Sequence, residues 1–490
     1  ATIIGARACR IAPKLECNAL KQAARAMLDE RHSLALDPGL APHLAAKLLK
    51  EPGAKVTTTL DVGIQQIALI ALKRQMMALG RERARDGAVI VVDNESGDIL
   101  AYVGGVAGDS TAAFVDGADA PRQAGSTLKP FLYGQVLEKG YLTPSSILDD
   151  SPVQLDTASG LYVPQNYDRA FKGPVSVRTA LAGSLNVPAV RTLMLAGTEA
   201  FRDRLWDTGY RGLTEDGDYY GFSLALGSAE VTLREQAAAY RSLARGGLWS
   251  PVRITAADNA EAPRRVLSAE AAWMVGDILS DPAARAVTFG LDSALKLPFW
   301  SAAKTGTSKA MRDNWCIGYS TRYTVAVWVG NLEGDSMKAV SGTSGAAPVW
   351  RDVMLELHRD QPGVAPLMPK GLERKSVRFE NAIEPPRFDY FLTGMSQPLS
   401  SLAPAGAQRP RIANPVSGAV YAMDPDVPGK RQRLAITVTG AVMGHRLLLD
   451  KQDIGDAAAR PLIMAGPGSH RITLMDEEGR RVDQVLFTVR

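Results

Sequence analysis

The sequence predicts a mixed α/β protein of the α+β type, in which an antiparallel sheet flanked by helices is followed by a small all-β sandwich. Three observations indicate this fold class. The chain has 490 residues, too many for one ordinary hydrophobic core, so two or three domains are expected. Two pairs of β-rich runs enclose a long region that is mainly helical. The last stretch alternates apolar and polar residues, as strands with one buried face do.

The chain begins with a segment, residues 1–55, that is expected to be a helical connector. Within it, ALKQAARAML (19–28) has the hydrophobic periodicity of a surface helix. The mixed domain is expected over residues 56–360. Near its start, the strand-like runs AVIVVD (88–93) and DILAYVGG (98–105) are joined by NESG, which indicates a hairpin.

The second pair of strands comes late in this domain. Helical segments fill its middle, and NWCIGYS (314–320) and YTVAVWVG (323–330) then indicate two β-strands. Residues 361–404 are rich in Pro, Gly and Ser and are predicted to be a linker with some local order. Residues 405–490 are predicted to form the C-terminal β-sandwich module, because GSHRITLMDEEGRRVDQVLFTV has the pattern of a hairpin that turns at Asp476–Gly479.

Composition and charge exclude several classes of function. Charged residues make up 22% and hydrophobic residues 46%, as in globular proteins and unlike disordered chains. The net charge of +4 is small, and no dense block of Lys and Arg indicates nucleic-acid binding. The 3 cysteines contain no CxxC pair, so neither a disulfide framework nor a zinc site is expected, and no cofactor is implied. No apolar run is long enough to predict a membrane span.

The first candidate site lies in QAGSTLKPFLYG, where Ser126 stands three positions before Lys129. On a helix these two positions share a face, and Pro130 is tolerated near a helix start, so Ser126 is expected close to a helix N-terminus. A serine hydroxyl needs a base before it can act as a nucleophile. The nearest histidine in the sequence is His43, far from the serine, which makes Lys129 the candidate base. The same S-x-x-K pattern also occurs at Ser301–Lys304, so the pattern alone does not identify a catalytic pair.

A second candidate site is the segment SAAKTGTSKAM, which precedes a β-rich run. It contains Lys304, Thr305, Gly306 and Thr307 in succession. A glycine between hydroxyl residues on an edge strand lets a substrate backbone approach closely. The lysine and the hydroxyls can bind a carboxylate. Taken alone, the segment could also be a turn with a solvated lysine.

A third candidate site is LAGSLNVPAV, where Ser184 and Asn186 precede Pro188 as in a loop that leads into a helix. Together, the three segments follow the order S-x-x-K, S-x-N and K-T-G. This order is the signature of penicillin-binding proteins and class A β-lactamases. Leu185 stands where the usual middle motif has Asp, so only the Ser and the Asn of that motif are matched.

The chain resembles the transpeptidase half of the class A penicillin-binding proteins, and among them most the 1C type. KVTTTLDVGIQQIA resembles the start of the family's transpeptidase domain, and YVPQNYDRAFKGPVSVRTALAGSLNVPAV the segment that leads to the second motif. SLALGSAEVTLREQAAAYRSLARGG and RDNWCIGYSTRYTVAVWVG resemble the helix before the third motif and the strands after it. FDYFLTGMSQP and the β-rich tail resemble the C-terminal module of the 1C type. The resemblance implies a fold like that of serine β-lactamases and DD-peptidases.

The resemblance also implies catalytic roles. Ser126 would attack the carbonyl of a D-Ala-D-Ala stem peptide of peptidoglycan and expel the terminal D-Ala. Lys129 would take the proton, which requires a neutral lysine; burial and the nearby charge of Lys304 both lower a lysine pKa. Ser184 would relay a proton to the leaving amine, and Asn186 would hold Lys129 and the substrate amide.

Substrate binding is assigned in the same way. Lys304, Thr305 and Thr307 would bind the terminal carboxylate, and Gly306 would belong to the same substrate-binding segment. The backbone N–H groups of Ser126 and Thr307 would form the oxyanion hole. The resemblance therefore implies a serine-type D-Ala-D-Ala transpeptidase, which passes the acyl group to an amine of a second stem peptide. β-Lactams would acylate the same serine.

The 1C type carries a glycosyltransferase domain and a membrane anchor before its transpeptidase domain. Residues 1–55 are too short for that domain and contain no E-D-x-x-F-x-x-H motif, so they are interpreted as a remnant of the region after it. Glycosyltransferase activity is therefore not expected from this chain. The resemblance places the protein on the periplasmic side of the bacterial inner membrane. The tail, 405–490, would recruit glycan strands or a periplasmic protein partner.

Three other functions are compatible with parts of the pattern. A DD-carboxypeptidase differs only in using water as the acceptor, which the motifs do not reveal. A non-catalytic module that binds peptidoglycan or a partner protein would not need the intact motifs. A class A β-lactamase needs a glutamate placed for deacylation, and Glu230 lies in a segment that resembles the synthase family instead.

Overall fold

The computed structural model describes residues 39–490 apart from 81, 107–109, 111, 158–159, 256, 259–260, 338, 380–381, 396–409, 416, 422–432, 440–443, 460 and 490. The helix predicted at 19–28 and most of the predicted connector lie outside the described residues. Among the described helices, none combines the length and the apolar character needed to cross a bilayer. The chain divides into two compact units between Gln397 and Pro398.

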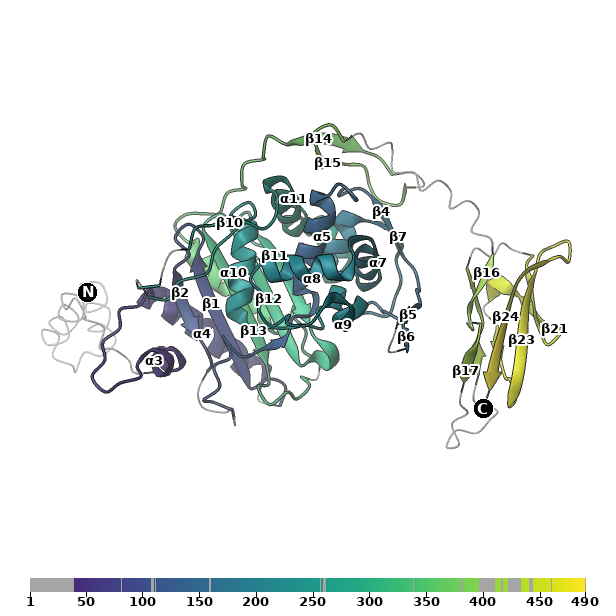
Figure 1. The fold of residues 1–490 in the computed structure, drawn as a ribbon, viewed down its shortest axis with the longest axis horizontal. Helices are drawn as coiled ribbons and strands as arrows, with labels where there is room; N and C mark the ends of the chain where they lie inside the picture. Colours follow the sequence, from purple (N-terminus) through teal and green to yellow (C-terminus); the bar gives the residue numbers. More distant parts are fainter. Residues whose placement is uncertain are drawn as a thin grey trace, which may run out of the picture. The chain divides into compact units, whose positions relative to one another are not determined.

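The centre of the first unit is a five-stranded antiparallel sheet (Figure 1). The strand order β11-β12-β13-β1-β2 joins the two predicted hairpins through β1 and β13, with Asp86 opposite Gly330 and Asp93 opposite Tyr323. The predicted antiparallel sheet is therefore confirmed, and the strand that carries Lys304 lies at its edge, as expected. The strands are β1 (Asp86–Asp93), β2 (Ile99–Val103), β11 (Ala302–Thr307), β12 (Asp313–Tyr319) and β13 (Tyr323–Gly330).

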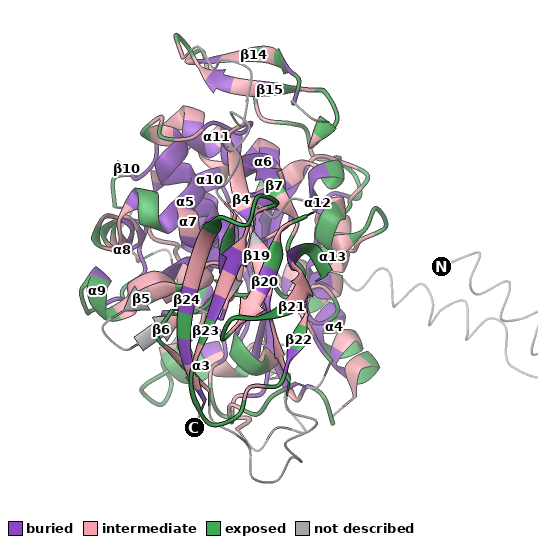
Figure 2. Ribbon diagram, turned by 90° about the vertical axis from the view of Figure 1, so that its right-hand side faces the viewer, coloured by how far each residue is buried: buried purple, intermediate pink, exposed green. Residues whose placement is uncertain are grey.

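Helices cover both faces of this sheet, which explains why its strands are almost continuously apolar. Along β1, Val89 and Val91 point to one face and Ala88 and Ile90 to the other, and all four are fully buried. The first face packs on α4 and α13; the second packs on α10 and α11, with the buried helix α5 next to α11 (Figures 1 and 2). These helices are α4 (Val62–Leu79), α5 (Lys129–Glu138), α10 (Leu233–Ala244), α11 (Ala269–Ser280) and α13 (Ala346–Leu357).

Shorter elements complete the first unit. The remaining helices are α3 (Pro42–Leu48), α6 (Val177–Ala182), α7 (Asn186–Ala196), α8 (Thr198–Asp207), α9 (Gly217–Tyr220) and α12 (Pro282–Phe289). Four two-stranded ladders pair β3 (Arg122–Gln123) with β8 (Glu230–Val231), β4 (Ile147–Asp150) with β7 (Gly173–Ser176), β5 (Leu155–Thr157) with β6 (Gly160–Tyr162), and β9 (Leu248–Trp249) with β10 (Arg264–Arg265).

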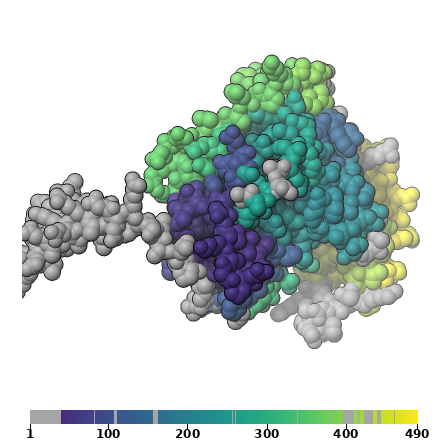
Figure 3. All heavy atoms as spheres, turned by 60° about the vertical axis from the view of Figure 1, so that its left-hand side comes forward, coloured from purple at the N-terminus to yellow at the C-terminus, as the bar shows by residue number. Residues whose placement is uncertain are grey.

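The segment after α13 differs from the predicted linker over 361–404. It forms a hairpin of β14 (Leu372–Val377) and β15 (Arg387–Leu392), which belongs to the first compact unit and lies over its helices (Figure 3). Leu372 contributes to the main core, and the Tyr390 ring lies 4.6 Å from that of Trp273. The Pro- and Gly-rich stretch that leads to the hairpin is therefore packed against the first unit and does not act as a free linker. Residues 396–404 of the predicted linker lie outside the described residues.

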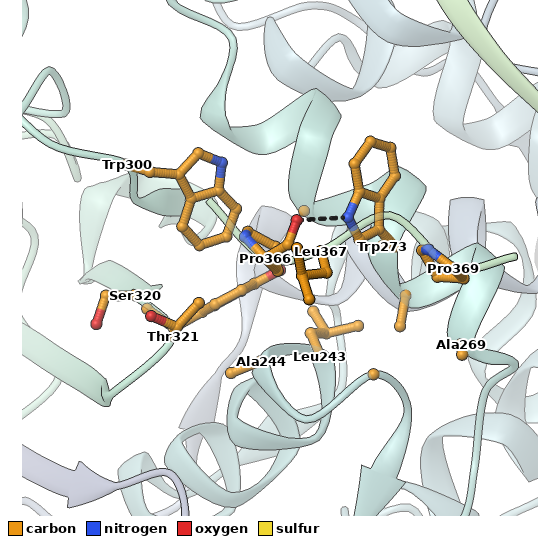
Figure 4. Close-up of a pocket in the computed structure, with 14 residues that line it drawn as sticks. Leu243, Ala244, Ala269, Trp273, Trp300, Ser320, Thr321, Pro366, Leu367 and Pro369 are labelled. Carbon is orange, nitrogen blue, oxygen red and sulfur yellow. Dashed lines mark hydrogen bonds between the residues drawn. The ribbon is translucent and has the colours of Figure 1, made fainter. Parts of the chain in front are cut away.

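Trp273 of α11 fixes the chain that leads to this hairpin. Its indole N–H donates to the Pro366 carbonyl at 3.1 Å, and Figure 4 shows Pro366 and Leu367 between Trp273 and Trp300. Together with neighbouring side chains they line a small, mainly apolar pocket of about 270 Å³. The pocket is formed where the connecting segment crosses α11.

In its described residues the second unit consists of β-strands and one 3₁₀ turn (Ala457–Ala459), as expected for the predicted β module. Its five-stranded sheet has the order β17-β24-β23-β20-β21, and two short ladders, β16-β19 and β18-β22, share a core with it. The predicted hairpin is confirmed as β23 and β24, whose alternating Ile472, Leu474, Val485 and Phe487 are buried. The strands are β16 (Arg411–Asn414), β17 (Ala419–Tyr421), β18 (Leu434–Ala435), β19 (Thr437–Thr439), β20 (Arg446–Leu449), β21 (Gln452–Asp456), β22 (Leu462–Ile463), β23 (Gly468–Met475) and β24 (Arg481–Val489).

Candidate active site

Ser126 lies on the 3₁₀ turn Gly125–Leu128, directly before α5. The turn fits closely against the edge strand β11: Gly125 has φ +56°, and a Cβ at this position would lie 2.9 Å from the Thr307 carbonyl oxygen. Glycine is therefore required where the serine turn meets the strand. The Ser126 hydroxyl is partly exposed, lines a large cleft and has no hydrogen-bond partner among the described residues. It is free to react with a molecule in that cleft.

Lys129 lies one turn after Ser126 and is fully buried. Its Nζ donates to three oxygens: the carbonyls of Ser184 at 2.8 Å and Leu185 at 3.0 Å, and Oδ1 of Asn186 at 2.7 Å. Three acceptors match the three N–H groups of an ammonium, whereas a neutral amine has only two. The neutral amine can therefore release one of these contacts and turn its lone pair toward the serine.

Two opposing influences act on this lysine. Burial, followed by the positive charge of Lys304, lowers the pKa of Lys129 well below its ordinary value, while Asp150 acts in the opposite direction. Desolvation disfavours the charged form because the interior replaces water poorly. The lowered pKa makes the neutral amine, the form able to accept a proton, easier to reach than in a free lysine.

The second motif lies on the loop between α6 and α7. Ser184 has φ +59°, a left-handed conformation that costs a non-glycine residue about 1–2 kcal/mol. Such strain is typical of functional positions. Asn186 is the first residue of α7, and its side-chain amide donates to the Gln165 carbonyl at 2.7 Å, which turns its Oδ1 toward Lys129.

The third motif occupies the edge strand β11. Lys304 is only 2% exposed, and its Nζ donates to the Ser184 hydroxyl at 2.7 Å and to the Thr305 carbonyl at 2.8 Å. Burial lowers the pKa of Lys304 to about 7, so this lysine exchanges its proton near neutral pH. The structure thus links all three motifs, since Ser184 bonds to one lysine through its carbonyl and to the other through its hydroxyl.

The residues of the three motifs converge on one cleft of about 950 Å³. Its lining includes Ser126, Ser184, Asn186, Thr305 and Thr307, while the two lysines lie beneath this surface. Side-chain hydroxyls therefore face the cleft, and the charges that act on them are buried.

Gly306 corrects one sequence expectation. The glycine was expected to let a substrate approach, but it is buried and is not among the residues that line the cleft. A Cβ there would lie 2.8 Å from the Ala124 carbonyl oxygen and 2.8 Å from the Thr127 methyl group. The residue is a glycine because β11 must approach the serine turn.

Sequence reasoning missed two supporting residues, Asn166 and Asp150. The Asn166 side chain accepts from the Asn186 backbone N–H at 2.8 Å and donates to both carboxylate oxygens of Asp150 at 2.8 Å. Asp150 is fully buried, and its second oxygen also accepts from the Lys172 N–H at 2.9 Å. The segment QNYDRAFKG resembles its counterpart in the family, but sequence alone gave no reason to connect it with a carboxylate on another strand.

The comparison with family models agrees with this geometry. Residues 87–355, more than half of the chain, match the penicillin-binding protein transpeptidase domain. The chain belongs to the penicillin-binding transpeptidase family. Residues 400–487 match the Penicillin-Binding Protein C-terminus Family.

Individual relatives point the same way. Penicillin-binding protein 1C of Escherichia coli is 37% identical over 320 residues, which are 64% of this chain and 40% of that protein. Penicillin-binding protein 1F of Bacillus subtilis is 29% identical over 64% of this chain and 44% of its own length. The likeness to the class A proteins, and to the 1C type among them, is therefore confirmed. The chain spans about 40% of the length of the curated relatives it matches.

Solved structures support the fold. Penicillin-binding protein 1A of Haemophilus influenzae aligns with a TM-score of 0.56 at 25% identity, over 65% of this chain and 55% of that one. The PonA1 protein of Mycobacterium tuberculosis aligns with a TM-score of 0.55 at 26% identity, over 64% of this chain and 87% of that one. The first unit therefore has the fold of a penicillin-binding transpeptidase.

Proposed function

We propose that the chain is a peptidoglycan DD-transpeptidase that works through an acyl-enzyme on Ser126 and is inhibited by β-lactams. The observation that carries this proposal is the pairing of an unbonded serine hydroxyl at the cleft surface with a buried lysine, Lys129, whose pKa is depressed. A serine with such a base, in a chain of this family, is suited to acyl transfer.

In the acylation step, Ser126 Oγ forms a bond to the carbonyl carbon of the penultimate D-Ala, and its proton passes to Lys129 Nζ. The backbone N–H groups of Ser126 and Thr307 stabilise the oxyanion. The peptide bond then breaks, and the leaving nitrogen receives, through the Ser184 hydroxyl, the proton that Lys129 had taken, so that Lys129 is neutral again for the second step. Lys304, 2.7 Å from that hydroxyl, orients it by donating a hydrogen bond.

The substrate's terminal carboxylate binds near the third motif. Lys304 provides positive charge beneath the surface, and Thr305 and Thr307 line the cleft above it. Charge-assisted hydrogen bonds are the strong ones at such a site. Gly306 lets the strand lie close to the serine turn.

In the second step, an amine of another stem peptide attacks the acyl carbon, Lys129 removes the amine proton and Ser126 leaves as the hydroxyl. The result is a cross-link in the cell wall, a reaction that takes place in the periplasm. Water could replace the amine and give carboxypeptidase products; the family match favours the amine. The cleft of about 950 Å³ lies at the upper end of the usual range for ligand pockets.

The test is labelling with a fluorescent penicillin. The native chain is expected to be labelled, and Ser126→Ala to remain unlabelled, because the acyl bond is proposed to form on the Ser126 hydroxyl. Ser301→Ala, in the chain's other S-x-x-K pattern, is the matched control and should label normally. Labelling of Ser126→Ala, or its absence from the native chain, would refute the proposal.

A further inference from the structure

We infer that the β14–β15 hairpin positions the second catalytic motif by holding the short helix α6, which leads into it. This inference rests on the proposed function of Ser184 and Asn186. Neither family match covers the hairpin, because the first ends at residue 355 and the second begins at residue 400. Helix α6 ends at Ala182, two residues before Ser184.

Glu384 and Arg387 of the hairpin bind the residue that precedes α6. Ser176 is the N-cap of α6; its N–H donates to Glu384 at 2.7 Å and its hydroxyl donates to the same carboxylate at 2.8 Å. Arg387 pairs with Glu384 at 2.5 Å and donates to the Ser176 hydroxyl at 3.0 Å. A carboxylate at a helix N-terminus also interacts favourably with the helix dipole.

Arg178, inside α6, makes the second connection. Its guanidinium donates to Asp389 of β15 at 2.6 Å, to Asp277 at 2.5 Å and to Asp281 at 3.2 Å. The arginine side chain is 5% exposed and Asp389 is 0% exposed. Burial alone would lower the pKa of Arg178, but the carboxylates of Asp389 and Asp277 outweigh it and raise the pKa. Asp389 is the most buried of the three carboxylates, and breaking a buried ion pair is costly.

The other end of α6 is fixed as well. The Gly183 carbonyl accepts from the Thr288 hydroxyl of α12 at 2.7 Å, and α12 is capped by Asp281, the residue that also pairs with Arg178. The six-residue helix spans only about 9 Å, so its two ends move together. A shift of α6 would therefore move Ser184 and the acceptors that hold Lys129.

A carboxylate elsewhere in the first unit provides a matched control. Glu138, the last residue of α5, pairs with Arg204 and accepts at 2.6 Å from the N–H of Ser268, which is the N-cap of α11. Like Glu384, it binds one arginine and one N-cap serine. It makes no such contact with α6. Glu384→Gln and Glu138→Gln thus remove comparable interactions, of which only one leads to the second motif.

The experiment compares these two variants in the full chain by melting temperature, by the rate of acylation by a fluorescent penicillin as a function of pH, and by hydrogen exchange. Both should lower the melting temperature. Only Glu384→Gln should slow acylation, by about tenfold, and displace its acidic limb, because the acceptors of Lys129 move. Only this variant should speed backbone exchange over residues 183–187.

Asp389→Asn should act in the same direction as Glu384→Gln and more strongly, and Arg387→Lys more weakly, so that at least one variant remains folded. Unchanged exchange at residues 183–187 in all three would overturn the inference, whatever the enzyme activity. Equal effects of Glu138→Gln on exchange there and on acylation would also overturn it, since the cause would then be general loss of stability. A native chain that penicillin does not label would instead refute the proposed function.

Discussion

The two units of the chain differ in where their charged side chains lie. In the first, charged side chains are placed in the interior: Lys129 is 0% and Lys304 is 2% exposed, and Arg178 and Asp389 form a buried pair. In the described part of the second unit every buried side chain is apolar. Its ion pairs, such as Arg446–Asp453, lie at the surface. Surface pairs contribute little to stability, whereas buried charges must be compensated or neutralised.

This difference indicates which unit can supply a general base. A buried lysine destabilises the fold unless it loses its proton, and that loss is what general-base catalysis needs. The described part of the second unit buries no charged side chain and contains none of the three motifs. We therefore expect changes to buried charges in the first unit to alter reaction rates and changes to the second unit to leave them unaltered.

The largest effect is expected from Lys129→Arg. A guanidinium keeps its proton, so the variant would retain a positive charge but lose the base. Acylation by a fluorescent penicillin should fall by about 10²- to 10⁴-fold, the range for loss of a general base. Lys50→Arg, at an exposed lysine, is the control and should react normally. A rate near that of the native chain in Lys129→Arg would show that another group takes the serine proton.

How much of this site could be predicted from the sequence depends on how far apart its residues lie along the chain. The Ser126–Lys129 pair was predictable, because residues three apart face the same way on a helical turn. The contact between Lys304 and the Ser184 hydroxyl joins residues far apart in the chain; the family resemblance placed both residues in one site but did not predict this contact. The buried Asp150 behind Asn166 was not predicted, since nothing in a lone Asp indicates which amide it will meet.

The fold shows the same limit. The strand-like runs of β1 and β13 predicted strands, but their pairing across the whole domain followed only from the structure. The hairpin of β14 and β15 was interpreted as part of a linker because residues 361–404 are rich in Pro, Gly and Ser. Its integration depends on Asp389 meeting Arg178, a contact that local composition does not encode.

A smaller effect is expected from pH, through both lysines. Below its pKa Lys129 is protonated and cannot accept a proton, so the acylation rate should rise with pH along a limb set by Lys129, at a pH well below that of a free lysine. Lys304 has a pKa of about 7, so above that pH it loses the charge that attracts a carboxylate. Penicillin, which carries a carboxylate, should give a bell-shaped profile; its methyl ester should keep only the rising limb.

The variant Lys304→Ala separates the effect of Lys304 on carboxylate binding from its effect on the pKa of Lys129. Without this positive charge the pKa of Lys129 should rise, which moves the rising limb to higher pH, and the falling limb should disappear. Acylation by penicillin should decrease about 10- to 100-fold, in keeping with loss of a charge-assisted contact, and acylation by the ester should decrease less. Equal decreases for both compounds, with the same shift in pH, would mean that Lys304 acts only by tuning Lys129.

The smallest effect is expected from removing the second unit. Residues 398–490 have their own apolar core, built around Leu447, Ile472 and Phe487, and contain none of the three motifs. Units of this kind usually fold independently. A chain that ends at Ala405 should therefore fold and be labelled at Ser126 within about twofold of the native rate.

A chain that ends at Gly371 provides the contrast, because it also lacks the hairpin. It removes Leu372 from the main core and leaves Arg178 buried without Asp389, so it should melt at a lower temperature and lose most of its labelling. Melting curves and labelling rates of the two shortened chains decide between the possibilities. If the chain ending at Ala405 lost labelling as fully as the one ending at Gly371, the second unit would be part of the catalytic fold. The second unit would then contribute to the reaction, and the different placement of charge in the two units would no longer indicate which unit is catalytic.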